Sequence, residues 1–140
     1  MSAEGQIRVL VVDDNPHVRS IVREVLSAAG MDVREANEGG AALRLLQQWR
    51  ADIALVDYEM LPVNGAEFTR QVRQSKVPGM RDMAVLMMTA HGDKTRVMEA
   101  REAGVDGLLA KPLSIGAILS RIEAVLARVN TRSGSLARVA

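Results

Sequence analysis

Five polar residues that could act together in one site stand directly after apolar runs of this chain. They are Asp13, Asp14, Asp57, Thr89 and Lys111. Carboxylate oxygens are hard ligands that suit Mg²⁺, an ion that keeps several waters and is commonly completed by phosphate oxygens. Three carboxylates in one place would repel each other and raise one another's pKa values unless a cation were bound. The three aspartates therefore indicate a site for a hard divalent cation, provided that folding brings them together.

The other two side chains, Lys111 and Thr89, add a positive charge and a hydroxyl donor. Lysine acts as a point charge toward phosphate, and a hydroxyl can donate a hydrogen bond to it. A carboxylate nucleophile, a metal, a cation and a hydroxyl together suit phosphoryl transfer, where positioning and charge neutralisation supply most of the catalysis. We therefore predict that Asp57 becomes an acyl phosphate.

Each of these residues taken alone has a plainer explanation. Asp13 or Asp14 could simply start a helix, and Thr89 could be an ordinary hydroxyl at the end of a strand. Lys111 alone could be a solvated surface side chain. The repetition of polar groups at the ends of successive apolar runs is what favours a shared site.

The apolar run at residues 53–57 would present Asp57 at the end of a buried strand. Consecutive apolar residues, half of them β-branched, are typical of a strand that is covered on both faces. Similar runs occupy residues 7–12, 83–88 and 107–110, and a weaker run with alternating polarity at residues 32–36 suits an edge strand. Helical patterns separate the runs, at residues 16–29, 38–49, 65–75, 93–103 and 114–128.

Five strands that alternate with five helices predict an α/β fold: a doubly wound, five-stranded parallel sheet with helices on both faces. In such a sheet the carboxyl ends of all the strands lie along one edge, and that edge is where ligands bind. Residues about a hundred positions apart, such as Asp14 and Lys111, are therefore expected to converge.

Composition restricts the function classes. The chain has 140 residues, 48% of them hydrophobic and 25% charged, with a net charge of +1, as expected for one ordinary globular domain. With no cysteine, disulfides and thiolate metal sites are excluded. No apolar run is long enough for a membrane span and no signal peptide is visible, so we expect a cytoplasmic protein. The three aromatic residues are scattered, without a basic groove, which argues against binding to nucleic acid.

The motifs VLVVDDNP, ALVDYEMLPVNG, VLMMTA and LLAKP occur in this order. Together they resemble the response-regulator receiver domains of two-component signalling, with the stand-alone chemotaxis regulators (CheY-like) as the nearest architecture. The resemblance covers residues 6–128 and implies a flavodoxin-like fold with strand order 2-1-3-4-5. It leaves residues 129–140 as a disordered C-terminal tail.

The resemblance implies a role for each acidic residue. Asp57 would be the phosphoacceptor, Asp14 a direct ligand of Mg²⁺, and Asp13 an acidic partner of the metal. Glu59 would give its backbone carbonyl to the metal. The side chains of Glu59 and His91 stand at positions that modulate phosphoryl lifetime in the family. The phosphoryl donor would be a phosphohistidine on a sensor histidine kinase or a phosphotransfer protein.

The same resemblance implies roles for the last two motifs. Thr89 would be the switch hydroxyl that moves toward the phosphoryl group, and the small Ala90 would leave room for the phosphate. Lys111 would pair with the phosphate. The family commonly has a cis bond before the proline that corresponds to Pro112, and only an X–Pro bond makes that isomer inexpensive.

Besides the side chains of Glu59 and His91 named above, two further places depart from the usual family pattern. Leu61 stands four residues after Asp57, where the family usually has proline, and Pro62 follows it. Leu108 takes a second switch position where Tyr or Phe is common, so a readout by ring rotation is absent. Coupling is then expected to run through Thr89 and the loop that leads into the fourth helix.

We therefore expect a signalling receiver that is no enzyme toward outside substrates and catalyses only its own phosphorylation and dephosphorylation. Phosphorylation would switch a surface made by the helix at 93–103, the strand at 107–110 and the helix at 114–128. With no room for an output domain, the output would be another protein, in chemotaxis or in another pathway. A monomer or a weak dimer is the expected state.

Three alternatives stay open. The chain could be a receiver-like scaffold that works without phosphorylation. It could be a Mg²⁺-dependent phosphatase of the haloacid-dehalogenase kind, although position 59 holds Glu59 where those enzymes carry a second Asp. Finally, Arg128, Arg132 and Arg138 could bind a cyclic dinucleotide, as arginine-rich extensions of some receivers do.

Overall fold

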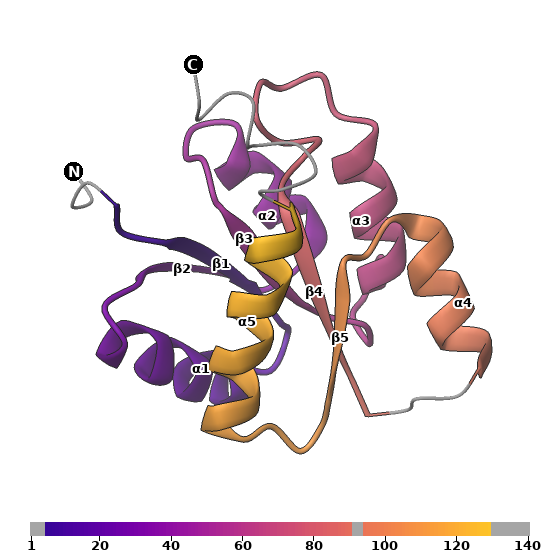
Figure 1. The fold of residues 1–140 in the computed structure, drawn as a ribbon. Helices are drawn as coiled ribbons and strands as arrows, with labels where there is room; N and C mark the ends of the chain where they lie inside the picture. The colour runs from indigo at the N-terminus through magenta and orange to yellow at the C-terminus, as the bar shows by residue number, and fades with distance from the viewer. Residues whose placement is uncertain (1–4, 91–93, 130–140) are drawn as a thin grey trace.

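The computed structural model describes residues 5–90 and 94–129. Strands and helices alternate along the whole described chain, and the ribbon runs between them through short loops (Figure 1). The elements are β1 (Arg8–Val12), α1 (Pro16–Ala28), β2 (Asp32–Ala36), α2 (Gly39–Leu46), β3 (Ile53–Asp57), α3 (Gly65–Arg73), β4 (Ala84–Thr89), α4 (Lys94–Ala103), β5 (Gly107–Ala110) and α5 (Ile115–Val129).

The strands form one parallel sheet in the order β2-β1-β3-β4-β5. β1 pairs with both β2 and β3, and β4 pairs with both β3 and β5. The predicted fold class and strand order are therefore confirmed. The alternating strand at Asp32–Ala36 lies at one edge, as its half-polar pattern predicts, because only one of its sides meets another strand.

Two apolar layers cover the sheet. Alternate residues of β1 and β3 point to opposite faces, so Val11 and Leu55 join the layer under α1 and α5. Leu10 and Ala54 join the layer under α2 and α3. α4 packs beside α3, farther along the sheet (Figure 1). Covering on both faces explains why every residue of β3 and β4 is buried.

Helix starts follow the side chains that can cap them. Asn15 accepts hydrogen bonds from two backbone N–H groups at the start of α1, and Pro16 takes the first helical position. Asn64 does the same for α3 by accepting from the backbone N–H of Glu67 at 2.9 Å. These caps place the N-termini of α1 and α3 next to the ends of β1 and β3.

Two helices are shorter than their apolar stripes predicted. α2 ends at Leu46, although the stripe runs on to Trp49, which is buried in the same layer. The backbone N–H groups of Gln47 and Gln48 bond three residues back, to Arg44 and Leu45, so the helix tightens into a turn before Trp49. α3 likewise ends at Arg73. The spacing of apolar residues reflects which side chains pack against the sheet. Because this packing continues past the last helical turn, the spacing overestimates the length of the helix.

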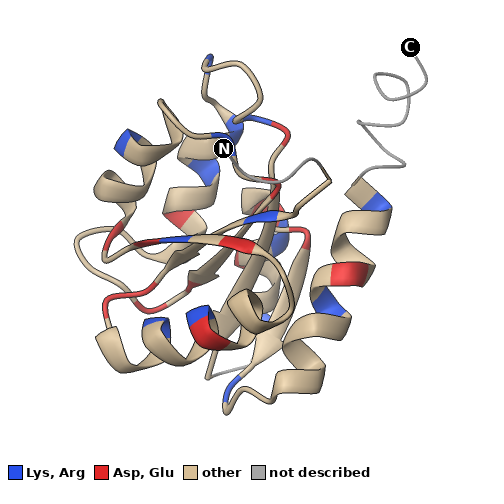
Figure 2. Ribbon diagram, turned by 90° about the vertical axis from the view of Figure 1, so that its left-hand side faces the viewer, with Lys and Arg blue, Asp and Glu red and all other residues tan. Residues whose placement is uncertain are grey.

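Basic and acidic residues are interspersed along the ribbon (Figure 2). Among the described residues, no helix is both long enough and apolar enough to cross a bilayer. The tail predicted to be disordered, and with it Arg132 and Arg138, lies outside the described residues apart from Val129, which ends α5.

Candidate functional site

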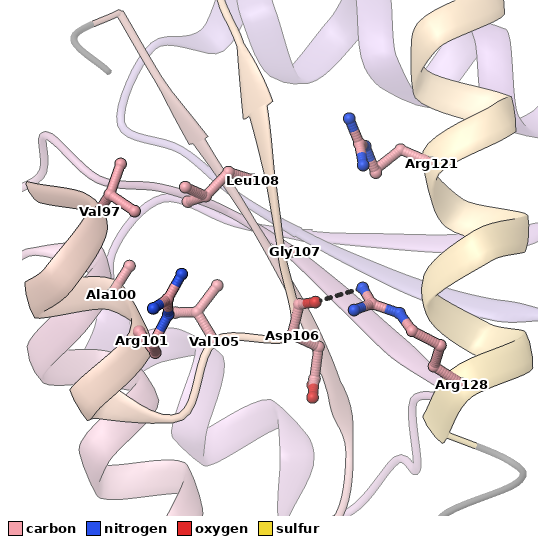
Figure 3. Close-up of a pocket in the computed structure, with 9 residues that line it drawn as sticks. All are labelled: Val97, Ala100, Arg101, Val105, Asp106, Gly107, Leu108, Arg121 and Arg128. Atoms are coloured by element: carbon pink, nitrogen blue, oxygen red, sulfur yellow. Dashed lines mark hydrogen bonds between the residues drawn. The ribbon is translucent and has the colours of Figure 1, made fainter. Parts of the chain in front are cut away.

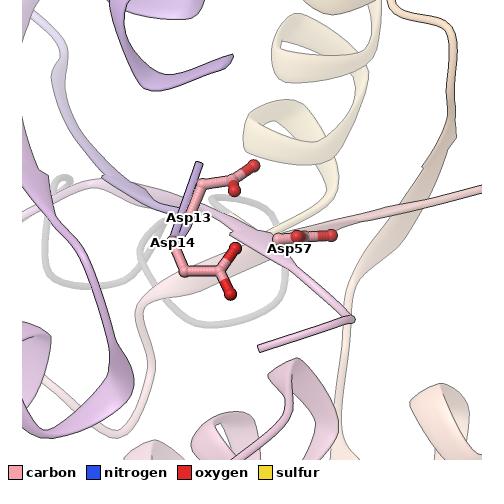
Figure 4. A group of neighbouring side chains, drawn as sticks. All are labelled: Asp13, Asp14 and Asp57. Carbon is pink, nitrogen blue, oxygen red and sulfur yellow. The ribbon is translucent and has the colours of Figure 1, made fainter. Parts of the chain in front are cut away.

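The sheet brings three carboxylates together at its carboxyl edge. Asp57 ends β3, and Asp13 and Asp14 directly follow β1, which pairs with β3. One oxygen from each of the three side chains lies within 4.8 Å of the others (Figure 4). The convergence that the sequence predicted for the aspartates is therefore what the fold produces.

Lys111 reaches the same cluster from the end of β5. Its Nζ donates to Oδ1 of Asp57 at 3.1 Å and lies 4.0 Å from Oδ2 of Asp13. The longer distance is an ion pair without a hydrogen bond. A lysine side chain that is 26% exposed can neutralise part of the cluster and still move when the charge there changes.

Asp13 is the most enclosed of the three carboxylates, with no exposed surface. Its Oδ1 accepts from the backbone N–H of Asn15 at 2.9 Å, whereas Oδ2 has no hydrogen-bond partner among the described residues. Burial raises the pKa of Asp13, and the negative charges of Asp57 and Asp14 raise it further, against the Asn15 hydrogen bond and the Lys111 charge. A buried carboxylate oxygen without a partner is what a hard cation would satisfy, so these residues fit Mg²⁺.

Gly65 allows α3 to begin beside Asp57. Its backbone N–H donates to the carbonyl of Tyr58 at 2.9 Å, and a Cβ on Gly65 would lie 2.6 Å from the carbonyl oxygen of Asp57. Any side chain would push the helix away from the strand end. On the acceptor itself, Oδ1 of Asp57 also takes the backbone N–H of Glu59 at 3.3 Å.

The other predicted site residues lie around this cluster in different ways. Thr89 is buried at the end of β4, and its carbonyl accepts from the backbone N–H of Lys111 at 3.0 Å. Ala90 follows it at the surface, and His91 lies outside the described residues. Leu108 is half-buried on β5 and lines a pocket between α4 and α5 instead of the carboxylate cluster.

In the part of the chain that the structure describes, two peptide bonds near the site are cis. One precedes Pro112, directly after Lys111, where the family resemblance implied it. The other precedes Pro62, in the loop where Leu61 and Pro62 depart from the family pattern.

Four residues join α4 to the loop at residues 58–64, which directly follows Asp57 and which we call the acceptor loop. The sequence did not reveal this group. The hydroxyl of Tyr58 donates to Oε1 of Glu99 at 2.6 Å, and the guanidinium of Arg96 lies 4.4 Å from the centre of the Tyr58 ring. Arg96 also pairs with Glu59 at 3.4 Å. We call Tyr58, Glu59, Arg96 and Glu99 the Tyr58 clasp. The position of Tyr58 next to Asp57 was visible in the sequence, but its partners about forty residues later were not.

Comparison with known proteins agrees with this geometry. The family model for the response regulator receiver domain matches residues 9–123. The chain is 31% identical to the chemotaxis protein CheY of Pseudomonas aeruginosa over 125 residues, which cover 89% of this chain and 99% of that protein. It is 34% identical to the response regulator MprA of Mycobacterium leprae, covering 87% of this chain and 52% of that protein. The chain thus spans about half the length of that relative.

Solved structures show the same arrangement. The chemotaxis response regulator CheY4 of Vibrio cholerae superposes with a TM-score of 0.81 at 30% identity, covering 86% of this chain and 98% of that one. A CheY-like receiver domain protein from Methanospirillum hungatei shares the fold, with a TM-score of 0.82 at 21% identity, covering 91% of this chain and 99% of that one. The chain therefore belongs to the response regulator receiver domain family, the signalling modules of two-component systems.

Proposed function

We propose that Asp57 accepts a phosphoryl group from the phosphohistidine of a sensor histidine kinase or a phosphotransfer protein. The observation that carries the proposal is the meeting of Lys111 with three carboxylates at one end of the sheet. A single carboxylate at that position would not indicate a phosphoryl-transfer site. Four charges that meet around a buried oxygen form a cradle for a metal and a phosphate.

The chemistry is a transfer between two nucleophiles. A carboxylate oxygen of Asp57 attacks phosphorus, the bond from phosphorus to the imidazole nitrogen breaks, and the released imidazole takes up a proton. Oδ2 of Asp57 accepts no hydrogen bond from the described residues, so we assign the attack to this oxygen. The side chains of Asp13 and Asp14, with the backbone carbonyl of Glu59, would hold Mg²⁺. When bound, Mg²⁺ neutralises charge on the phosphoryl oxygens.

Lys111 and Thr89 then respond to the new phosphate. Lys111 exchanges its bond to Asp57 for a phosphoryl oxygen, and the hydroxyl of Thr89 donates to another. Ala90 leaves room for the group, and the side chains of Glu59 and His91 affect how fast water removes it. The readout runs from Thr89 into α4, since Leu108 has no ring to rotate.

The output is a change of partner at the surface made by α4, β5 and α5. A phosphate group carries a charge of about −1.5 to −2 near neutral pH. Because the bond to phosphorus uses up the single negative charge of the Asp57 carboxylate, phosphorylation adds a net charge of only about −0.5 to −1 at the end of β3. The main alternative, a scaffold that works without phosphorylation, keeps the same surface but leaves Asp57 unmodified. The two differ in whether the surface responds to the phosphoryl group.

The test uses acetyl phosphate as a small donor with Mg²⁺, on the wild type and on Asp57→Asn. We expect the mass of a phosphoryl group on the wild type only, and loss of the label when Mg²⁺ is chelated. Equal labelling of Asp57→Asn would overturn the acceptor assignment. Steady release of product from a phosphomonoester such as p-nitrophenyl phosphate would instead show a phosphatase.

A further inference from the structure

A pocket of about 380 Å³ opens between α4 and α5, along the outer edge of β5 (Figure 3). Arg101 from α4, Leu108 from β5, and Arg121 and Arg128 from α5 are among its lining residues. In Figure 3 the side chains of Arg121 and Arg128 extend from α5 toward β5, and Arg101 stands on the opposite side. We call this the arginine pocket.

The charges that line the arginine pocket are unbalanced. Among the described residues that line it, Asp106 is the one carboxylate. It is already engaged, because Arg73, which is outside the lining, pairs with it at 2.8 Å, and the backbone N–H of Val85 donates to the same oxygen at 2.9 Å. The positive charge of the three arginines is therefore not compensated by the pocket itself.

The arginines also keep donors for a ligand. Within the described part of the chain, neither Arg101 nor Arg121 has a carboxylate within 4.0 Å. Arg128 donates to the backbone carbonyl of Asp106, and this bond draws its side chain toward β5. Each guanidinium presents five N–H donors in a fork that fits a carboxylate.

The floor of the arginine pocket suits an extended peptide. Among the strands of residues 5–90 and 94–129, β5 pairs with β4 alone, so its other edge can form backbone hydrogen bonds with an added strand. The half-buried side chains of Leu108 and Val97 offer apolar contact next to that edge. None of the described lining residues is aromatic, so these residues offer a nucleotide base no stacking platform.

We propose that the arginine pocket binds an extended acidic segment of a partner protein, with its backbone along β5 and its carboxylates on Arg101 and Arg121. A second copy of this chain fits poorly, because a two-fold interface would set the same three arginines against each other. The proposal names the partner chemistry of the output surface, and it rests on the proposed function only for control by phosphorylation.

The test is an NMR titration of the full chain with a peptide of alternating glutamate and leucine, against the same peptide with glutamine. We expect shifts at Leu108 and Arg121 and a Kd that rises about ten-fold in Arg101→Gln/Arg121→Gln. Arg81→Gln is the matched control, since Arg81 is exposed and lies outside the pocket. Its Kd should equal that of the wild type, and added salt should weaken binding.

Three results would overturn the proposal: no shifts with the acidic peptide, equal binding of the glutamine peptide, or equal weakening by Arg81→Gln. A wild-type dimer that Arg101→Gln/Arg121→Gln converts to monomer would also overturn it, in favour of a second copy. Repeating the titration with Mg²⁺ and beryllium fluoride separates the two proposals. If beryllium fluoride leaves the Kd for the acidic peptide unchanged, binding is not controlled by phosphorylation. The NMR shifts of the untreated chain still show whether the arginine pocket binds an acidic segment.

Discussion

At the scale of single residues, Asp13 carries an electrostatic cost that the folded chain does not relieve by itself. Its side chain has no exposed surface, one of its oxygens lacks a hydrogen-bond partner among the described residues, and two further carboxylates lie close by. Lys111 at 4.0 Å offsets part of this cost. The remainder is available to drive the binding of a cation, because a cation removes repulsion that the apo protein must tolerate.

Asp13→Asn should therefore raise the free energy of unfolding in Mg²⁺-free buffer, by about 1–3 kcal/mol. The pKa of Asp13 is raised above its ordinary value of 3.8, so the penalty exists above the raised pKa, where the carboxylate is charged in the fold. It disappears as pH falls below 3.8, where both states are protonated, and the advantage of the variant should shrink accordingly. Urea unfolding across this pH range measures it.

Mg²⁺ supplies the second half of this test. Saturating Mg²⁺ at about 100 times its Kd should stabilise the wild type by about 2.7 kcal/mol and leave Asp13→Asn nearly unchanged. Asp14→Asn, at an exposed position, is the control that should gain less in the absence of metal. If the wild type is more stable than Asp13→Asn without Mg²⁺, the buried carboxylate of Asp13 does not destabilise the fold.

Gly65→Ala should disturb the acceptor directly. The new Cβ would lie 2.6 Å from the carbonyl oxygen of Asp57, so α3 or the end of β3 must move, at a cost of about 1–3 kcal/mol. Gly116→Ala is a matched control, since nothing lies within 4 Å of its Cβ and alanine favours a helix. Thermal unfolding of both variants measures the difference. If the two variants are equally stable, the close approach of Gly65 to the carbonyl oxygen of Asp57 does not contribute to stability.

At the scale of elements, the positions of the site residues are set by where the strands end, and the sequence predicted these strand ends. Apolar runs that stop at a polar residue located β3 and β4 to within a residue, because a strand buried on both faces has little freedom in sequence. Helix ends were less predictable, as α2 shows, because apolar packing continues beyond the last helical turn. The Tyr58 clasp was not predictable at all, since Tyr58 and Glu99 meet only once α4 has docked.

Tyr58→Phe tests whether the Tyr58 clasp holds α4 near the acceptor loop. The variant keeps the ring under Arg96 but loses the 2.6 Å hydrogen bond to Glu99, worth about 1 kcal/mol. We expect faster amide exchange in α4, measured by hydrogen–deuterium exchange, with β1 and β3 unchanged. Glu67→Gln, which breaks an exposed pair with Arg70 on α3, should leave α4 unchanged. If amide exchange in α4 is the same in Tyr58→Phe and in the wild type, the hydrogen bond from Tyr58 to Glu99 does not stabilise α4.

At the scale of the whole molecule, one sheet joins two apolar layers, so each layer depends on the other. The alternation of runs along the chain was sufficient to predict this architecture. The strand order was not, because β3 and β4 are equally apolar and their pattern does not say which strands lie beside them. The resemblance to a family implied the strand order, and the structure confirms it.

Ile122→Ala tests the dependence of the layers on each other. Ile122 is a buried residue of α5, on the side of the helix that packs on the sheet, whereas the single tryptophan, Trp49, lies in the opposite layer. We expect a loss of about 2–5 kcal/mol, with the transitions from Trp49 fluorescence and from circular dichroism shifting together. Ile21→Ala, at a side chain that is 59% exposed, should change little. A fluorescence transition that stays in place while the dichroism shifts would mean that the layers unfold separately.

The most direct measurement of the central claim locates the phosphoryl group on the chain. Borohydride reduces an aspartyl phosphate to homoserine, so peptide mass spectrometry after treatment with acetyl phosphate, Mg²⁺ and borohydride identifies the modified carboxylate. We expect homoserine at position 57 with Mg²⁺ and none when Mg²⁺ is chelated. Homoserine at position 13 or 14, or an unmodified position 57 in a chain that carries the label, would contradict the assignment of Asp57 as the phosphoacceptor.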